Sequence, residues 1–181
     1  MKALMYVCRT KPWLVKNEHE NFWYTMNQHD FEVFKNVKTY NGYVVASFDF
    51  EVEGVLNNPK WKGADFREIF YRKSCLTGSE IHNYLNRSDG YAIHIKNLEI
   101  FEEAKELSNY LKELPNDEYE PVKRAPQNMM KVYYKYGETS MFDSFVLISV
   151  HSEWACKILN EEKTIELRKK VLKEMLEYAK Y

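Results

Sequence analysis

The stretch FVLISVHSEWACKILNEEKTIELR, residues 145–168, predicts how the C-terminal part of this chain folds. Residues 145–150 form a short apolar run that is typical of a buried strand. The residues after it have the apolar spacing of a helix, which Ser152 would cap at its N-terminus. Polar and apolar side chains then alternate over residues 164–168, as in a strand with one buried face. We therefore expect a strand, a helix and a second strand.

The second strand should present a polar cluster. Successive side chains of a strand point to opposite faces, so Thr164, Glu166 and Arg168 would share one face, with Lys163 just before them. A carboxylate beside a guanidinium, with a hydroxyl and an ammonium nearby, can bind the hydrogen-bonding edge of a base or an amide. The alternative is an exposed ion pair on an edge strand, which contributes little to stability.

The composition is that of one globular domain spanning residues 1–181. Hydrophobic residues make up 45% of the chain and charged residues 29%, and the formal net charge is −1. This charge argues against binding nucleic acid by bulk electrostatic attraction, so any such binding must come from a local basic patch.

The cysteines indicate a reducing compartment and no metal centre. Cys8, Cys75 and Cys156 are widely separated and show no metal-ligand spacing, so we expect reduced thiols in a cytoplasmic protein. We find no apolar run of membrane-spanning length and no signal-peptide pattern, so we expect no membrane partner. Nothing in the sequence points to a cofactor.

The rest of the chain predicts further strands and helices. Strands are expected at residues 3–8, 44–53 and 91–100. Helices are expected near residue 66, after a capping box formed by Thr77 and Glu80, over residues 102–114, and within the C-terminal segment 169–181. Residues 13–40 form an unassigned insertion. These elements predict an α+β fold: a small, partly open mixed β-barrel of five or more short strands, flanked by three or four helices.

Three segments resemble ASCH domains, which belong to the PUA-like superfamily. Residues 145–168 resemble the opening of the family, which runs strand, helix and a Gly-x-Lys-x-x-Glu-x-Arg signature. GYVVASFDFEVE, residues 42–53, resembles the next long barrel strand. YAIHIKNL, residues 91–98, and APQNMM, residues 125–130, resemble the closing strands of small ASCH-like proteins encoded by bacterial viruses. The resemblance implies a PUA-like barrel and an origin in a phage or its host.

The order of these segments differs from that of the family, because the signature comes last. We interpret this as a circular permutation, which is tolerated where domain termini lie close together at the surface. The alternative is one domain that lacks its start, followed by the start of a second. The family's glycine falls at Glu161, so we expect Asn160 to adopt the left-handed turn conformation.

In PUA-like domains the signature residues line a cleft at the barrel mouth. The resemblance implies a ligand site there formed by Lys163, Thr164, Glu166 and Arg168. Arg168 would hold a phosphate or a carbonyl group, Glu166 would accept a hydrogen bond from a base, and Lys163 would neutralise charge.

Two further groups of residues are candidates for nucleic-acid contacts. Gln127 and Asn128 can donate and accept hydrogen bonds at a base edge, although they also suit a turn after Pro126. A basic segment with tyrosines could follow a single strand by charge and stacking, although a solvated loop would look the same. Its candidate residues are Lys123, Arg124, Lys131, Tyr133 and Lys135.

The resemblance favours a non-catalytic module that binds RNA, modified DNA or a free nucleotide. One alternative is an amidohydrolase acting on an acylated cytidine, with Lys163, Thr164 and Glu166 as the catalytic set. The related enzymes carry a threonine at the position of Glu166, and a carboxylate does not replace a hydroxyl nucleophile. The other alternative is a viral anti-defence protein that sequesters a nucleotide signal or binds a host defence protein.

Overall fold

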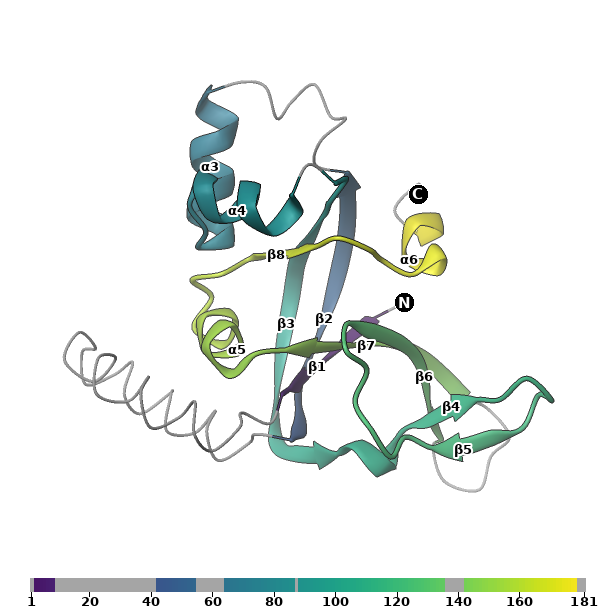
Figure 1. Ribbon diagram of the computed structural model, residues 1–181. Coiled ribbons are helices and arrows are strands. Elements are labelled where there is room, and N and C mark those ends of the chain that lie inside the picture. The colour runs from purple at the N-terminus through teal and green to yellow at the C-terminus, as the bar shows by residue number, and fades with distance from the viewer. Residues whose placement is uncertain (1, 9–41, 55–63, 87, 136–141, 179–181) are drawn as a thin grey trace, which may run out of the picture.

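The computed structural model describes residues 2–8, 42–54, 64–86, 88–135 and 142–178. Within these residues it is an α+β fold with one sheet and four α-helices (Figure 1). The strands are β1 (Lys2–Val7), β2 (Tyr43–Gly54), β3 (Tyr91–Glu106), β4 (Leu111–Glu113), β5 (Tyr119–Pro121), β6 (Met129–Lys135), β7 (Phe142–Val150) and β8 (Ile165–Arg168). The helices are α3 (Ala64–Ser74), α4 (Gly78–Leu85), α5 (Ser152–Leu159) and α6 (Lys173–Tyr178), with a 3₁₀ turn, η2 (Leu107–Asn109).

The eight strands form a mixed sheet in the order β5-β4-β6-β7-β1-β2-β3-β8. The pair β1 and β7 is parallel, whereas β1 pairs antiparallel with β2, β2 with β3, and β3 with β8. Both strands predicted from residues 145–168 therefore belong to the same sheet as the strands at residues 43–54 and 91–106. The stretch does not form a detached unit.

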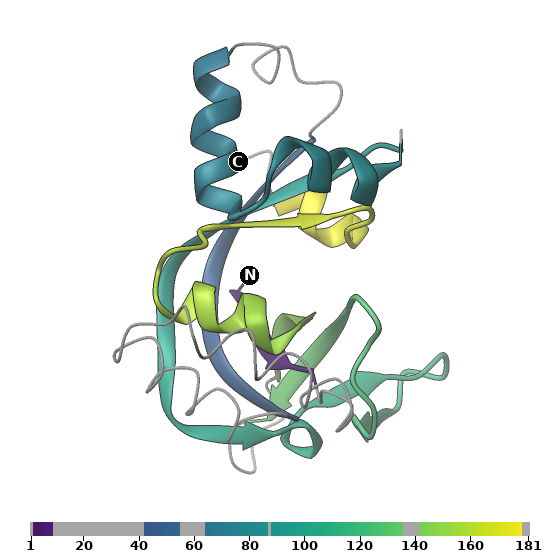
Figure 2. The same cartoon turned by 60° about the vertical axis from the view of Figure 1, so that its left-hand side comes forward.

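The sheet curls strongly but stays open. Strands β2 and β3 are long, at 12 and 16 residues, and their pairing contains two register shifts, which increase the local bend of a sheet. Figure 2 shows β2 and β3 as a continuous arc, with β8 crossing above α5. The sheet ends at β5 and β8 and is not closed, which agrees with the partly open arrangement that the sequence predicts, although β2 and β3 are longer than the short strands expected.

Apolar side chains cover both faces of the sheet. Ala3, Met5 and Val7 of β1 point to one face, where they pack in a core with α5 and Met175 of α6. Leu4 and Tyr6 point to the other face, under the segment that follows β3. A third cluster joins α3 and α4 to β3 and β8. Its buried members are Phe70, Ile81, Leu85, Ala92, Ile165 and Leu167. The predicted apolar footing of β8 is confirmed.

The helix predicted over residues 102–114 is wrong. Strand β3 runs on to Glu106, and η2 and β4 follow it. The glutamate-rich sequence suits a helix locally, but Lys105 pairs with Val44 across to β2, while Phe101 and Ala104 pack against opposite cores. Tertiary pairing therefore overrides the local preference.

The ends of two C-terminal helices also differ from expectation. His151, not Ser152, is the N-cap residue of α5, and it makes no side-chain capping bond. Asn160 has φ −85°, whereas Glu161 itself takes the left-handed conformation at φ 59°. The predicted C-terminal helix of residues 169–181 begins later than expected, because α6 starts at Lys173; residues 179–181 lie outside the described residues.

Two other predictions of the sequence have different outcomes. The capping box of Thr77 and Glu80 is confirmed at the start of α4, with both hydrogen bonds formed. The insertion at residues 13–40 lies outside the described residues. In the described ranges, no helix is long and apolar enough to cross a membrane.

Candidate functional site

The charged side chains of the signature stretch meet at one edge of the sheet. The Nζ atom of Lys163 lies 3.4 Å from Oε2 of Glu166, and Nη2 of Arg168 lies 2.9 Å from Oε1 of the same carboxylate. The strand alternation places Glu166 and Arg168 on the face opposite Ile165 and Leu167. We call Lys163, Glu166, Arg168 and the amide of Asn128, described below, the β8 cluster.

Lys163 is the buried end of the β8 cluster. Its side chain is 2% exposed, and its ammonium donates a hydrogen bond to the carbonyl oxygen of Ser74, at 2.6 Å. The ring of Trp154 lies 5.0 Å from Nζ, within cation–π range. Burial lowers the pKa of Lys163 below its ordinary value, and the negative charge of Glu166 opposes this shift. The lysine is thus held from inside the protein.

Arg168 links the edge strand β8 to β7 and to the segment before β6, neither of which pairs with β8 in the sheet. Although β8 is an edge strand, Nη2 of Arg168 donates to the carbonyl oxygen of Ser149 in β7, at 2.7 Å. Nη1 donates to Oδ1 of Asn128, at 3.0 Å, and Nδ2 of Asn128 donates to the carbonyl oxygen of Lys170, at 2.9 Å. These side-chain bonds hold β8 to the segment before β6, where no backbone ladder does so.

One atom of this arrangement is unsatisfied. Nε of Arg168 is buried and has no hydrogen-bond partner among the described residues. The guanidinium donates five hydrogen bonds at most, and a buried donor without a partner costs free energy. The side chains of Arg168 and Glu166 are 12% and 11% exposed and that of Lys163 is 2% exposed, while Asn128 is partly buried, so access to the β8 cluster lies away from Lys163.

Two of the residues predicted for the cleft are not joined to the β8 cluster by side-chain contacts. Thr164 takes part through its backbone: its N–H donates to the carbonyl of Lys73, and its own carbonyl accepts from the N–H of Ile95. Gln127 is exposed next to Asn128. The structure therefore brings together Lys163, Glu166 and Arg168 from residues 163–168 with Asn128, from a segment distant in sequence.

The predicted basic patch divides into two parts. Lys123 and Arg124 are exposed and line a cavity of about 450 Å³ together with Tyr6 and Tyr43. Lys123 also lies 4.0 Å from Glu120, an acid just outside the segment. Lys123 and Arg124 follow the end of β5, whereas Lys131 and Tyr133 lie on β6.

In β6 the tyrosine predicted for the patch, Tyr133, is not exposed. Tyr133 is 8% exposed, and its hydroxyl donates a hydrogen bond to the carboxylate of Glu113. Nζ of Lys131 lies 5.2 Å from the centre of the Tyr133 ring, so this lysine covers the ring. The side chain of Lys135 lies outside the described residues.

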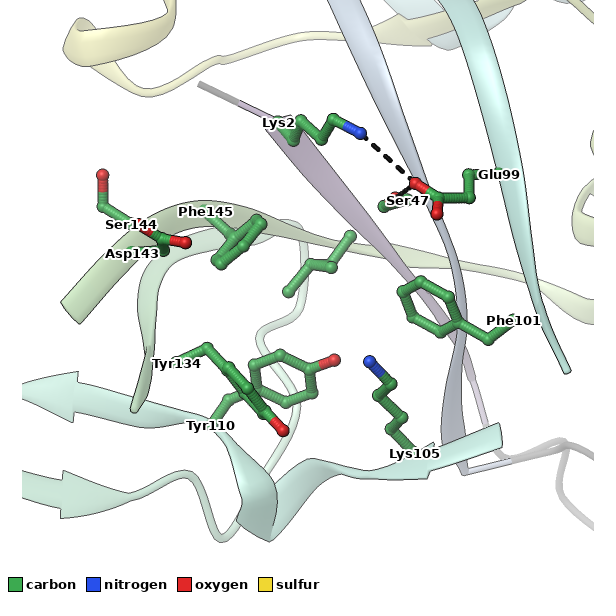
Figure 3. A pocket seen from close by; sticks show the side chains of 11 residues that line it. Lys2, Ser47, Glu99, Phe101, Lys105, Tyr110, Tyr134, Asp143, Ser144 and Phe145 are labelled. Carbon is green, nitrogen blue, oxygen red and sulfur yellow. Dashed lines mark hydrogen bonds and ion pairs between the residues drawn. The ribbon is translucent and has the colours of Figure 1, made fainter. Parts of the chain in front are cut away.

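A second cavity, of about 600 Å³, was not predicted from the sequence. Figure 3 shows Lys105 pointing into it between Phe101 and Tyr110, with Tyr134 and Phe145 on other sides. We call it the aromatic cavity. Its lining comes from β1, β2, β3, β6, β7 and the residue after η2, so only the sheet pairing assembles it. The second half of β3, IFEEAKE at residues 100–106, shows no strand alternation, so no local sequence pattern predicted this cavity.

The fold and the site define an α+β protein with an open, curled eight-stranded sheet and a buried Lys-Glu-Arg cluster at its edge. Comparison with protein-family models, curated proteins and solved structures finds no match to this chain. The resemblance to ASCH domains therefore stays a prediction. In the described part of the chain, no group of three or more His, Cys, Asp or Glu could hold a metal ion.

Proposed function

We propose that this protein is a non-catalytic, PUA-like module that binds RNA, modified DNA or a free nucleotide at the accessible end of the β8 cluster. Arg168 and Asn128 contact the ligand, since both are less buried than Lys163 and carry hydrogen-bond donors. Glu166 orients the guanidinium, and Lys163 holds Glu166 from inside the protein. Lys163 thus acts as a positioning residue.

The observation that carries this proposal is the polar network around Arg168. A guanidinium is held by a carboxylate, an amide and a backbone carbonyl, and its Nε remains without a partner. Removing charges from water is costly, and charged residues that are kept in such positions are often functional. Asn128 adds an amide that can donate and accept at a base edge.

The order of the strands supports the family relation on which the ligand class rests. Strand β8 pairs with β3, as a permuted domain requires, and β7 lies in the same sheet. Glu161, which stands where the family has glycine, adopts the left-handed conformation that glycine favours.

Thermal-shift measurements with nucleosides, nucleotides, cyclic nucleotides, short RNA and short DNA test this proposal. A ligand that binds the folded state raises the melting temperature. Arg168→Lys keeps the charge but loses the bidentate fork, so it should abolish the rise. Thr77→Ala removes a helix cap outside the β8 cluster, lowers stability by about 1 kcal/mol and should leave the rise unchanged.

No shift with any nucleic-acid component, together with co-purification of a host protein, would contradict the proposal and favour the anti-defence alternative. For a ligand that does bind, the salt dependence separates its classes. A steep fall of affinity with salt indicates a polynucleotide backbone, and a weak fall indicates a small ligand.

One observation favours the amidohydrolase alternative. Lys163 has a lowered pKa and lies 3.4 Å from Glu166, as a lysine in a catalytic pair would. Its amine, however, already donates to Ser74 in the interior. Incubation with N4-acetylcytidine decides the point: turnover that is lost in Lys163→Met would establish an enzyme, and no turnover is expected.

A further inference from the structure

We propose that the aromatic cavity is a second binding site, distinct from the β8 cluster, for a planar ring that carries an anionic group, of the class of a nucleoside monophosphate. The proposal rests on a lysine that has no ion-pair partner among the described residues and is surrounded by aromatic rings. The volume of the cavity, about 600 Å³, falls within the range of roughly 300–1,000 Å³ that small-molecule sites occupy.

Lys105 supplies the positive charge. Its Nζ lies 4.3 Å from the centre of the Phe101 ring and 5.5 Å from that of Tyr134. Among the described residues no carboxylate lies within ion-pair distance of it. The residue is partly buried, and its ammonium points into the cavity among the rings (Figure 3). A phosphate group would complete its coordination.

Aromatic side chains supply surfaces for stacking. Phe101, Tyr134 and Phe145 border the cavity and are only partly buried, whereas Tyr110 is buried at its base. The rings of Tyr110 and Tyr134 lie 5.6 Å apart in a tilted pair, which holds the Tyr134 ring in place. Stacking of a base on such a ring is worth about 1–3 kcal/mol in single-strand binding proteins.

The other polar end of the cavity is a carboxylate. Oε2 of Glu99 accepts hydrogen bonds from Nζ of Lys2, at 3.3 Å, and from Oγ of Ser47, at 3.2 Å (Figure 3). The hydrogen bond from Lys2 holds the pKa of Glu99 below its ordinary value, so the carboxylate is ionised at neutral pH. Its other oxygen can accept an N–H of a base.

The charges give the ligand one orientation. Glu99 and Asp143 line the cavity with negative charge, and Lys2, the other lysine of the lining, is paired with Glu99, so Lys105 is the lining lysine without an ion-pair partner among the described residues. Figure 3 shows Asp143 on the opposite side of the cavity from Lys105. The anionic group therefore lies at Lys105, the ring lies between the aromatic side chains, and an N–H donor of the ring faces Glu99.

Calorimetric titration of the full chain with AMP, GMP, CMP and UMP tests this inference. At least one monophosphate should bind, and its nucleoside and inorganic phosphate alone should each bind at least about tenfold more weakly, because each lacks one of the two contacts. Lys105→Gln and Phe101→Leu should each weaken binding about tenfold or more. Lys112→Gln, which changes a lysine of β4 outside the cavity, should leave affinity unchanged.

Two outcomes would overturn the inference: no monophosphate binds to the wild-type chain, or binding survives both Lys105→Gln and Phe101→Leu in folded protein. Loss of binding in Arg168→Lys but not in Lys105→Gln would assign the ligand to the β8 cluster instead. The variant that loses binding therefore shows which of the two proposed sites holds the ligand. A cooperative thermal unfolding transition in each variant, as in the wild type, shows that the fold is intact.

Discussion

The β8 cluster and the aromatic cavity use charge in opposite ways. In the β8 cluster the carboxylate of Glu166 lies between two cations, and nearly all polar atoms have partners. In the aromatic cavity Lys105 contacts rings and has no ion-pair partner among the described residues. The first arrangement resists change because its members depend on one another. In the second arrangement the charge of Lys105 is not paired within the described residues, which is why we propose that it binds an anion.

This difference separates stability from binding. Arg168 joins β8 to β7, so it stabilises the curl of the sheet as well as contributing to the proposed ligand site. Lys105 lines the aromatic cavity and forms no ion pair with another described residue. Substitutions in the two regions should therefore differ in their effect on the free energy of unfolding, and the following predictions are ordered by that effect.

Arg168→Ala should have the largest effect, lowering the free energy of unfolding by about 3 to 5 kcal/mol, because it leaves Glu166 with a single cation and removes donors from Ser149 and Asn128. Urea unfolding measures the loss. Arg124→Ala, at an exposed arginine, serves as the control and should change stability by less than about 0.5 kcal/mol. A similarly small loss of stability in both variants would show that Arg168 does not stabilise the fold.

Lys163→Met should lower stability by about 1 to 3 kcal/mol near neutral pH, because the carbonyl of Ser74 loses its donor while the packing volume is kept and Glu166 keeps Arg168, the nearer of its two cations. The loss should depend on pH. The pKa of Lys163 is lower in the folded chain than its ordinary value of 10.5, so between these values the unfolded chain binds more protons at this position.

The contribution of Lys163 to the free energy of unfolding therefore rises as the pH rises towards 10.5. Unfolding of the wild type and Lys163→Met in parallel, from neutral pH upwards, should show a growing difference in favour of the wild type. A difference that is constant with pH would show that the lysine titrates alike in both states.

Glu161→Gly should raise stability by about 0.5 to 1 kcal/mol, since glycine adopts the left-handed conformation without the steric cost that a side chain incurs. The side chain is exposed, so little packing is lost. A rise in melting temperature confirms that this turn is strained, and a fall would indicate a contact of Glu161 that stabilises the fold.

Lys105→Gln should have the smallest effect on stability, within about 0.5 kcal/mol, because no ion pair with a described residue is broken. Thermal unfolding without ligand measures this. A large loss would mean that the cation–π contacts of Lys105 stabilise the sheet and would weaken its assignment to a ligand site.

Local patterns in the sequence predicted the secondary structure well where they did not conflict with tertiary pairing. The alternation at residues 164–168 predicted which side chains of β8 are buried, and the capping box predicted the start of α4. The segment after Phe101 has the residues of a helix, yet it is a strand because β2 offers it a partner. Backbone pairing between distant segments is not visible in local spacing.

The candidate site shows the same division. The sequence by itself determined that Lys163, Glu166 and Arg168 would lie close together, since strand and turn geometry act over a few residues. Only the tertiary structure decided that Lys163 is buried, that Asn128 and Ser149 receive Arg168, and that an aromatic cavity surrounds Lys105. Burial and contacts between distant segments depend on how the whole sheet curls, and no short pattern encodes that curvature.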